Sequence, residues 1–171
     1  MVHRGHVIDL AIGTFEGPDG TRFERELVHH KGAVSVVAVD DDANAVVVRQ
    51  YRAAVDAFLL ELPAGKLDVV GEDPLACAQR ELAEEAGLAA DEWRPLVAFH
   101  NSPGFSDELH RVYLARSLHE VPDDRQGIEE QAMTVLRVPL TEAADRIAAG
   151  EIVDAKTCIG LLLAREQLGI R

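Results

Sequence analysis

The stretch GKLDVVGEDPLACAQRELAEEAGL, residues 65–88, decides the fold of this chain and raises its main chemical question. Nine acidic residues lie between Glu61 and Glu92, against two basic ones, Lys66 and Arg80. Like charges three or four residues apart destabilise a helix by roughly a few tenths of a kcal/mol per pair. A folded protein that crowds carboxylates in this way therefore needs a reason for keeping them together.

The second half of this stretch predicts an α-helix over residues 73–86. Asp73 suits the N-cap, Pro74 suits the first helical position, and Gly87 suits the C-cap. Apolar residues spaced three and four apart form a stripe that faces the core: Leu75, Ala78, Leu82 and Ala86. A second face gathers three acids, Glu81, Glu84 and Glu85.

A solvated acidic face is the plainest interpretation of these three glutamates. Three features favour a cation site instead. The acids are clustered rather than alternated with lysine, they follow the glycine-containing loop LPAGKLD (62–68), and Glu72 adds a further acid at the helix start. Carboxylates near backbone carbonyls suit hard divalent cations such as Mg²⁺, which complete their shell with water and substrate phosphate.

The whole chain has the composition of a soluble folded protein. It has 171 residues, 47% of them hydrophobic, and a net charge of −13, which disfavours nucleic acids and anionic lipids as partners. Cys77 and Cys158 form no disulfide or metal-site pattern, and the seven histidines show no metal-ligand spacing, which predicts surface or packing roles. Because neither a signal peptide nor a membrane span is recognisable, we expect a cytoplasmic protein.

The remaining segments predict strands on both sides of the acidic helix. Residues 1–31 are polar with turn signals at 17–20, which favours one or two strands or a small hairpin. Residues 33–39 and 45–50 predict a hairpin, and further strands are expected at 58–62, 96–100, 110–115 and 133–138. Two later helices are expected, capped by Thr141 and Asp154. This order predicts an α+β or mixed α/β fold, with a mixed β-sheet, flanking helices and an N-terminal β extension.

The acidic stretch resembles the signature box of the Nudix hydrolases. That pattern is Gly, five residues, Glu, seven residues, then Arg-Glu-apolar-x-Glu-Glu-x-Gly-apolar. The match is complete from Glu72 through the segment RELAEEAGL, residues 80–88. One departure lies upstream, where six residues rather than five separate Gly65 from Glu72, an insertion that a loop tolerates.

The resemblance implies a metal site and the Nudix fold, an α/β/α sandwich. It implies three metal ligands, namely the side chains of Glu81 and Glu85 and the backbone carbonyl of Ala64. Glu84 would support the site, while Glu72 and Arg80 would hold the loop to the helix. The implied cofactor is Mg²⁺, with Mn²⁺ and Zn²⁺ as alternatives at a carboxylate site.

Flanking segments look like the ADP-ribose pyrophosphatase subgroup of that family. Pro103 in SPGFSDE lies 16 residues past Gly87, and the segments VRQYR, ELPAG and GEIVDAKT are also similar. The implied reaction is hydrolysis of ADP-ribose to AMP and ribose 5-phosphate. The implied substrate-binding residues are Arg52, Glu61, Ser102, Pro103, Gly104 and Glu108.

By the same resemblance, the general base comes from the acidic segment EVPDDRQGIEEQAM, residues 120–133. Glu129 or Glu130 falls at that position, with a slight preference for Glu129, and Gln131 stands where relatives often carry another acid. The subgroup usually forms homodimers by exchanging N-terminal strands. Residues 1–31 are therefore expected to be a dimerisation segment, and residues 32–171 the Nudix domain.

Two other classes of function remain open from the sequence. One is a Nudix activity on a different substrate, such as NADH, a dinucleoside polyphosphate or another nucleotide sugar. The other is a non-catalytic Nudix module that binds ADP-ribose. The intact acids of the box argue against the binding module, and a structural acidic protein is the least favoured interpretation.

Overall fold

A computed structural model describes residues 1–122 and 133–170 of the chain. No helix within these residues is long and apolar enough to cross a membrane. The elements, in chain order, are β1 (His3–Arg4), β2 (Ile8–Glu16), β3 (Arg22–His30), β4 (Ala33–Ala38), β5 (Asn44–Arg52), β6 (Ala57–Glu61), β7 (Ala64–Lys66), α1 (Pro74–Ala86), β8 (Leu88–His100), β9 (Leu109–Glu120), β10 (Thr134–Pro139), the 3-10 turn η1 (Leu140–Glu142), α3 (Ala143–Ala148) and α4 (Ala155–Gln167).

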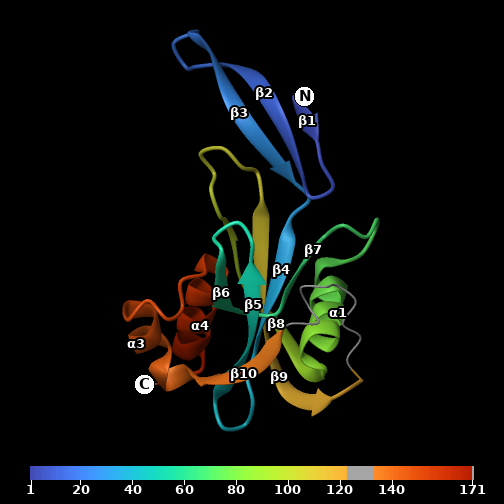
Figure 1. The fold of residues 1–171 in the computed structure, drawn as a ribbon, viewed down its shortest axis with the longest axis vertical. Coiled ribbons are helices and arrows are strands. Elements are labelled where there is room, and N and C mark those ends of the chain that lie inside the picture. The colour runs from blue at the N-terminus through green and yellow to red at the C-terminus, as the bar shows by residue number, and fades with distance from the viewer. Residues whose placement is uncertain (123–132, 171) are drawn as a thin grey trace.

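Strands sandwiched between helices form the body of the molecule (Figure 1). One sheet has the strand order β7-β4-β9-β8, and a second has the order β10-β5-β6. Strand β4 runs parallel to β9, while every other pair in these two sheets is antiparallel. Helix α1 lies on one side of these strands and α4 on the other, so the prediction of a mixed α+β sandwich is confirmed.

Strand β4 is the centre of the core because both of its faces are covered. Val34 and Val36 pack in the cluster that includes Leu82 of α1. Val37 packs in the opposite cluster, which includes Leu161 of α4. Burial on both faces explains why this strand reads as a continuous apolar run rather than as an alternating pattern.

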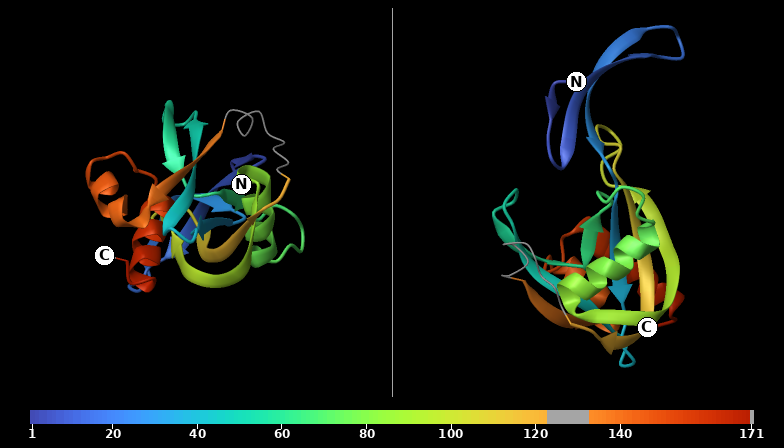
Figure 2. Two further views of the ribbon diagram at one scale, coloured as in Figure 1. Left: turned by 90° about the horizontal axis from the view of Figure 1, so that it is seen from below. Right: turned by 90° about the vertical axis from the view of Figure 1, so that its right-hand side faces the viewer.

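The first three strands form a separate N-terminal sheet that projects from the body (Figures 1 and 2). Strands β2 and β3 pair along their whole length, from Ile8 opposite His30 to Glu16 opposite Arg22. The connecting turn contains Gly20 at a φ of 79°, a conformation that glycine adopts without strain. Several large apolar side chains are exposed on this sheet and its turns: Val7, Ile8, Ile12, Phe15 and Phe23.

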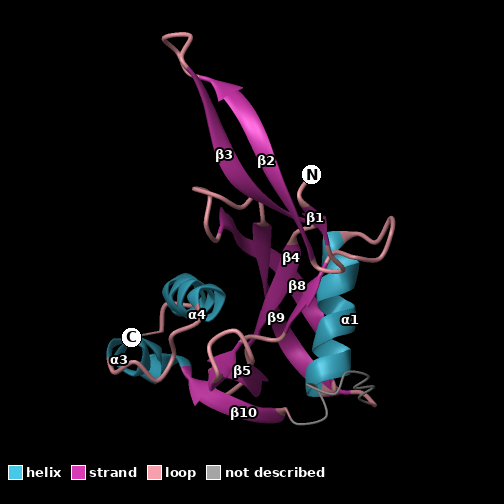
Figure 3. Cartoon of the chain, turned by 45° about the horizontal axis from the view of Figure 1, so that its top comes forward, coloured by secondary structure: helices cyan, strands magenta, loops and turns pink. Residues whose placement is uncertain are grey.

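Helix α1 has the ends that the sequence predicts (Figure 3). Asp73 accepts a hydrogen bond from the Leu75 amide, Pro74 is the first helical residue, and Gly87 adopts the left-handed conformation at a φ of 64°. The extra residue before the helix is absorbed in the loop, where Val70 is fully exposed. The insertion therefore leaves the helix unchanged.

Two local predictions were wrong. The strands at 33–39 and 45–50 do not form a hairpin, because they touch only at a Val39–Ala45 bridge and then enter different sheets. Thr141 does not cap a helix, since it lies inside η1 and α3 follows without a side-chain cap. Asp154 does cap α4, through a hydrogen bond from the Thr157 amide.

Candidate active site

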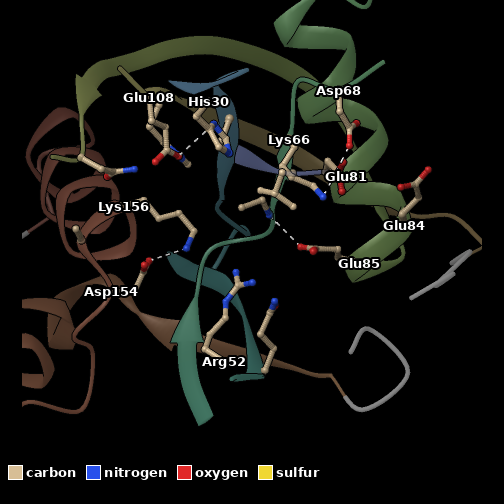
Figure 4. Close-up of a pocket in the computed structure, with 18 of the residues that line it drawn as sticks. His30, Arg52, Lys66, Asp68, Glu81, Glu84, Glu85, Glu108, Asp154 and Lys156 are labelled. Atoms are coloured by element: carbon tan, nitrogen blue, oxygen red, sulfur yellow. Dashed lines mark hydrogen bonds and ion pairs between the residues drawn. The ribbon is translucent and has the colours of Figure 1, made fainter. Parts of the chain in front are cut away.

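A cavity of about 1020 Å³ opens between α1, β7, the end of β5, the start of α4 and the loop of residues 101–108. Three groups of side chains line it (Figure 4). We call Glu81, Glu84 and Glu85 of α1 the acidic wall. Arg52 and Lys156, which face it across the cavity, are the basic wall. Residues 101–108 bring Asn101, Ser102 and Glu108 to the cavity, and we call them the substrate loop after the role that we propose for them.

The acidic wall depends on the close approach of β7 to α1. A Cβ atom on Gly65 would lie 1.9 Å from Oε1 of Glu81 and 2.4 Å from its Cγ. Only glycine at this position leaves room for the Glu81 carboxylate where it now lies. The close approach of the Glu81 side chain therefore explains why the sequence signature begins with a glycine.

Arg80 offsets the repulsion among the carboxylates of this region. Its Nη1 donates to Oε1 of Glu81 at 2.8 Å and to Oε2 of Glu84 at 2.9 Å. Its Nε donates to Oε1 of Glu72 at 2.9 Å, and Nη2 donates to Oε2 of the same residue at 3.1 Å. The hydrogen bond to Glu72 is the main reason why the pKa of Arg80 is raised above its ordinary value. Glu72 and Arg80 thus hold the loop to the helix, as the sequence predicts.

Glu85 ties the acidic wall to the residue before Gly65. Its side chain is buried, with 5% of the residue exposed, and its Oε2 accepts a hydrogen bond of 2.9 Å from the Ala64 amide. Ala64 and Glu85 are therefore neighbours, and Ala64 also lines the cavity.

The donor groups of this wall fit a hard divalent cation. They are oxygens, and the space over Gly65 accommodates a carboxylate that a Cβ atom would displace. Within residues 1–122 and 133–170, no three acidic, histidine or cysteine side chains enclose a point closely enough to hold an ion alone. Carboxylate and backbone carbonyl oxygens are the ligands that hard divalent cations take, and water can supply the rest of the shell.

The basic wall is held by one buried carboxylate, Glu61, and one partly buried carboxylate, Asp154. Arg52 donates from Nε and Nη2 to the two carboxylate oxygens of Glu61, both at 2.7 Å. Lys156 also donates to Glu61, and it forms an ion pair of 3.0 Å with Asp154. Burial by itself would raise the pKa of Glu61, but the bonds from Arg52 and Lys156 outweigh it and leave that pKa below its ordinary value.

The arrangement changes the interpretation of Glu61 and adds two residues that the sequence did not indicate. Glu61 is only 2% exposed and lies behind Arg52, so it orients the guanidinium from within the protein. Lys156 was missed, and Asp154 was recognised only as a helix cap. Both belong to the segment GEIVDAKT, residues 150–157, where an acid and a lysine two residues apart were the available signal.

The third side of the cavity is polar. Ser102 and Glu108 line it, whereas Pro103 and Gly104 are exposed members of the substrate loop outside the lining. Interaction with His110, together with Asn101 and the charge of His30, holds the pKa of Glu108 at about 2. The carboxylate is therefore ionised at neutral pH and can accept hydrogen bonds.

Two histidines also lie on this side of the cavity. His30 and His110 line the cavity, and each has its Nδ1 about 4 Å from Oε1 of Glu108. The other ring nitrogen of His110 lies 2.9 Å from the buried hydroxyl of Ser35. Sequence spacing could not reveal this cluster, because its members come from three strands and a loop.

The predicted general base falls on residues whose positions are not described. Glu129 and Glu130, with the neighbouring Gln131, lie outside residues 1–122 and 133–170. Strand β9 ends at Glu120 and β10 begins at Thr134, so these residues belong to the connection between the two strands.

Comparisons with known proteins agree with this geometry. A model of the NUDIX domain family matches residues 29–156. The chain is 46% identical to an ADP-ribose pyrophosphatase of Mycobacterium tuberculosis over 94% of its own length and 78% of that protein. It is 39% identical to an ADP-ribose pyrophosphatase of Bacillus subtilis, over 94% and 86%. A solved structure described as an ADP compounds hydrolase superposes with a TM-score of 0.83 at 25% identity, covering 98% of this chain and 90% of the other.

The close approach at Gly65 generates a test of the acidic wall. Gly65→Ala should weaken Mn²⁺ binding about tenfold or more, because the added methyl displaces the Glu81 carboxylate. Isothermal titration calorimetry with Mn²⁺ measures this, alongside thermal unfolding to confirm that the fold persists. Gln79→Ala on the exposed side of α1 is the control and should bind as the wild type does. Unchanged affinity in Gly65→Ala would contradict the assignment of this wall as the metal site.

Proposed function

Since this chain belongs to the Nudix family of hydrolases, we propose that it cleaves the diphosphate bond of ADP-ribose to give AMP and ribose 5-phosphate. One observation carries the proposal, namely a single cavity in which three clustered carboxylates face two cations. A diphosphate is the ligand that needs both sides, because its charge is matched by a metal on one side and by Arg52 and Lys156 on the other. The two relatives named ADP-ribose pyrophosphatase support this choice of diphosphate.

The acidic wall would hold a divalent cation, and Mg²⁺ is the ion we propose. Glu81, Glu85 and the backbone carbonyl of Ala64 would be its ligands, with Glu84 supporting the site. When bound, such an ion neutralises the charge of the diphosphate and polarises its phosphorus. Mn²⁺ or Zn²⁺ could replace it, because carboxylate oxygens accept all three ions.

The other two sides of the cavity would hold the substrate. Arg52 is oriented by the two hydrogen bonds that it donates to Glu61, so its remaining donors can meet a phosphate oxygen without a further loss of side-chain freedom. Glu108 is ionised and would accept hydrogen bonds from the hydroxyl groups of the terminal ribose. Ser102 would add a hydroxyl to the same end, and the turn containing Pro103 and Gly104 would shape the loop above the ribose.

The chemical step also needs a general base, and we assign this role to none of the residues described above. We propose that Glu129 or Glu130 accepts a proton from the attacking water. The water oxygen forms a bond to one phosphorus, and the bond from that phosphorus to the bridging oxygen breaks. The bridging oxygen leaves with the other phosphate, so the products are two phosphate monoesters and no covalent bond to the enzyme forms.

Residues 1–31 would serve as a dimerisation segment, and residues 32–171 as the catalytic domain. The N-terminal sheet exposes large apolar side chains while it projects from the body, which favours a second copy of this chain as its partner. Val7, in the turn between β1 and β2, also lines the cavity. The N-terminal segment thus reaches both the proposed interface and the proposed site.

The reaction is tested by product analysis with ADP-ribose in the presence and absence of Mg²⁺. AMP and ribose 5-phosphate should appear only with the metal. Glu85→Gln should lower kcat/KM by about 100-fold or more, because it removes a charged ligand. Glu142→Gln removes an exposed carboxylate far from the cavity and should behave as the wild type.

Absence of turnover with every divalent metal would remove ADP-ribose as the substrate. The next step would then be a panel of NADH, dinucleoside polyphosphates and other nucleotide sugars. Binding of ADP-ribose without turnover would indicate a binding module instead.

The base is identified by comparing Glu129→Gln with Glu130→Gln. The variant that loses the base should have a kcat lowered by about 10²- to 10⁴-fold with little change in KM, and its kcat should lose the acidic limb of the pH profile. The other variant serves as the control, since it removes the same charge one residue away. Equal and small effects in both variants would place the base elsewhere.

The oligomeric state is tested with Ile12→Glu, which puts a charge on an exposed apolar residue of β2. Light scattering after gel filtration should give a dimer for the wild type and a monomer for this variant, because the charge would be desolvated at the interface. Leu162→Glu on the exposed side of α4 is the matched control and should stay dimeric. A monomeric wild type would refute the proposal.

A further inference from the structure

The substrate loop is attached to the N-terminal sheet by backbone hydrogen bonds. The amide of Val28 in β3 donates to the carbonyl of Phe105 at 2.7 Å, and the amide of Asp107 donates to the carbonyl of Val28 at 3.2 Å. These bonds form a short parallel bridge between Val28 and Ser106. The loop between β8 and β9 therefore lies beside the end of β3, as the views in Figures 1 and 2 also show.

One carboxylate reinforces this attachment. Oδ1 of Asp107 accepts a hydrogen bond of 2.8 Å from the His30 amide, and Oδ2 lies 2.6 Å from Nδ1 of His29. The hydrogen bond from His29 is the main reason why the pKa of Asp107 is lowered. A single side chain of the loop thus holds two consecutive residues of β3.

Hydrogen bonds within the loop connect Asp107 to the residues that line the cavity. The amides of Phe105 and Ser106 both donate to the carbonyl of Ser102, at 3.1 and 2.9 Å. The amide of Glu108 lies 3.3 Å from the Ser106 hydroxyl, which can accept its hydrogen. Residues 102–108 are therefore a compact unit, and displacement of Asp107 would displace Ser102 and Glu108 as well.

Strand β3 also contributes directly to the cavity. His30 donates its amide hydrogen to Asp107, while its ring lies 4.0 Å from the carboxylate of Glu108. The end of β3 is thus in contact with the substrate loop on one side and with the cavity on the other.

We propose that Asp107 is a positioning residue that couples the N-terminal sheet to the substrate loop, so that the affinity for the nucleotide sugar depends on how that sheet is held. The coupling acts through the His29 side chain and the His30 amide. The identity of the substrate in this inference rests on the proposed function, whereas the contacts of Asp107 do not depend on it. The N-terminal sheet is then part of the substrate site as well as a dimerisation segment.

The exposure of the pair indicates a geometric role. The side chains of His29 and Asp107 are 46% and 53% exposed, and ion pairs at that exposure contribute little to stability. Loss of the Asp107 carboxylate should therefore leave the fold intact while the loop moves.

Kinetics of Asp107→Ala and Asp107→Asn with ADP-ribose test the proposal. Asp107→Ala should raise KM about fivefold to tenfold with kcat within about twofold of the wild type, because loop position affects binding more than the chemical step. Asp107→Asn should recover most of the affinity, since its amide oxygen can still accept from His30. Glu16→Ala, which breaks an exposed ion pair in the same sheet with Arg22, is the control and should change neither constant.

Amide hydrogen exchange provides a readout that does not need turnover. Exchange at Phe105 and Ser106 should become faster in Asp107→Ala and stay at the wild-type rate in Glu16→Ala. An unchanged KM with unchanged exchange would overturn the proposal. So would a parallel loss of kcat, thermal stability and dimer in Asp107→Ala, because that pattern means a structural role only. If the wild type does not hydrolyse ADP-ribose, the proposed function fails and the exchange rates alone decide the coupling.

Discussion

The guanidinium of Arg80 is the group on which the acidic wall depends, because it donates to Glu72, Glu81 and Glu84 together. Without a counter-charge, carboxylates on adjacent helical turns would repel each other and weaken α1. Arg80 supplies that charge before any cation binds, and through Glu72 it also anchors the preceding loop. The same residues can therefore fold as a stable helix and still present oxygens to an ion.

In the basic wall the signs are reversed, because here carboxylates hold two cations in place. Arg52 and Lys156 are each paired with a carboxylate, Glu61 or Asp154, which fixes the positions of the two cations. Burying such pairs costs desolvation, and their hydrogen bonds recover much of it while fixing the geometry. Cations that are fixed before the substrate arrives need little reorganisation when it binds, which is how preorganised charges lower a barrier.

The sequence rules for helix capping correctly predicted features that depend only on neighbouring residues. Asp73, Pro74 and Gly87 mark the ends of α1, because capping depends on residues within one turn. The rules for turns failed for the strands after Gly32 and before Arg52, since turn chemistry says where the chain reverses and nothing about which strands pair beyond the turn. The cluster around Glu108 and the partners of Glu61 were not predictable, because key contacts join distant parts of the chain. Lys156 and Glu61 are 95 residues apart, and His110 and Ser35 are 75 residues apart.

The sides of the cavity are anchored to different parts of the protein. The acidic wall stands on α1, whose apolar side packs into the core around Val34 and Val36. The substrate loop instead connects β8 and β9, and Asp107 binds it to the N-terminal sheet. A change in that sheet can therefore move Ser102 and Glu108 while leaving Glu81 and Glu85 in place. The position of this loop and the geometry of the acidic wall are thus mechanically separable in this fold, although both line one cavity.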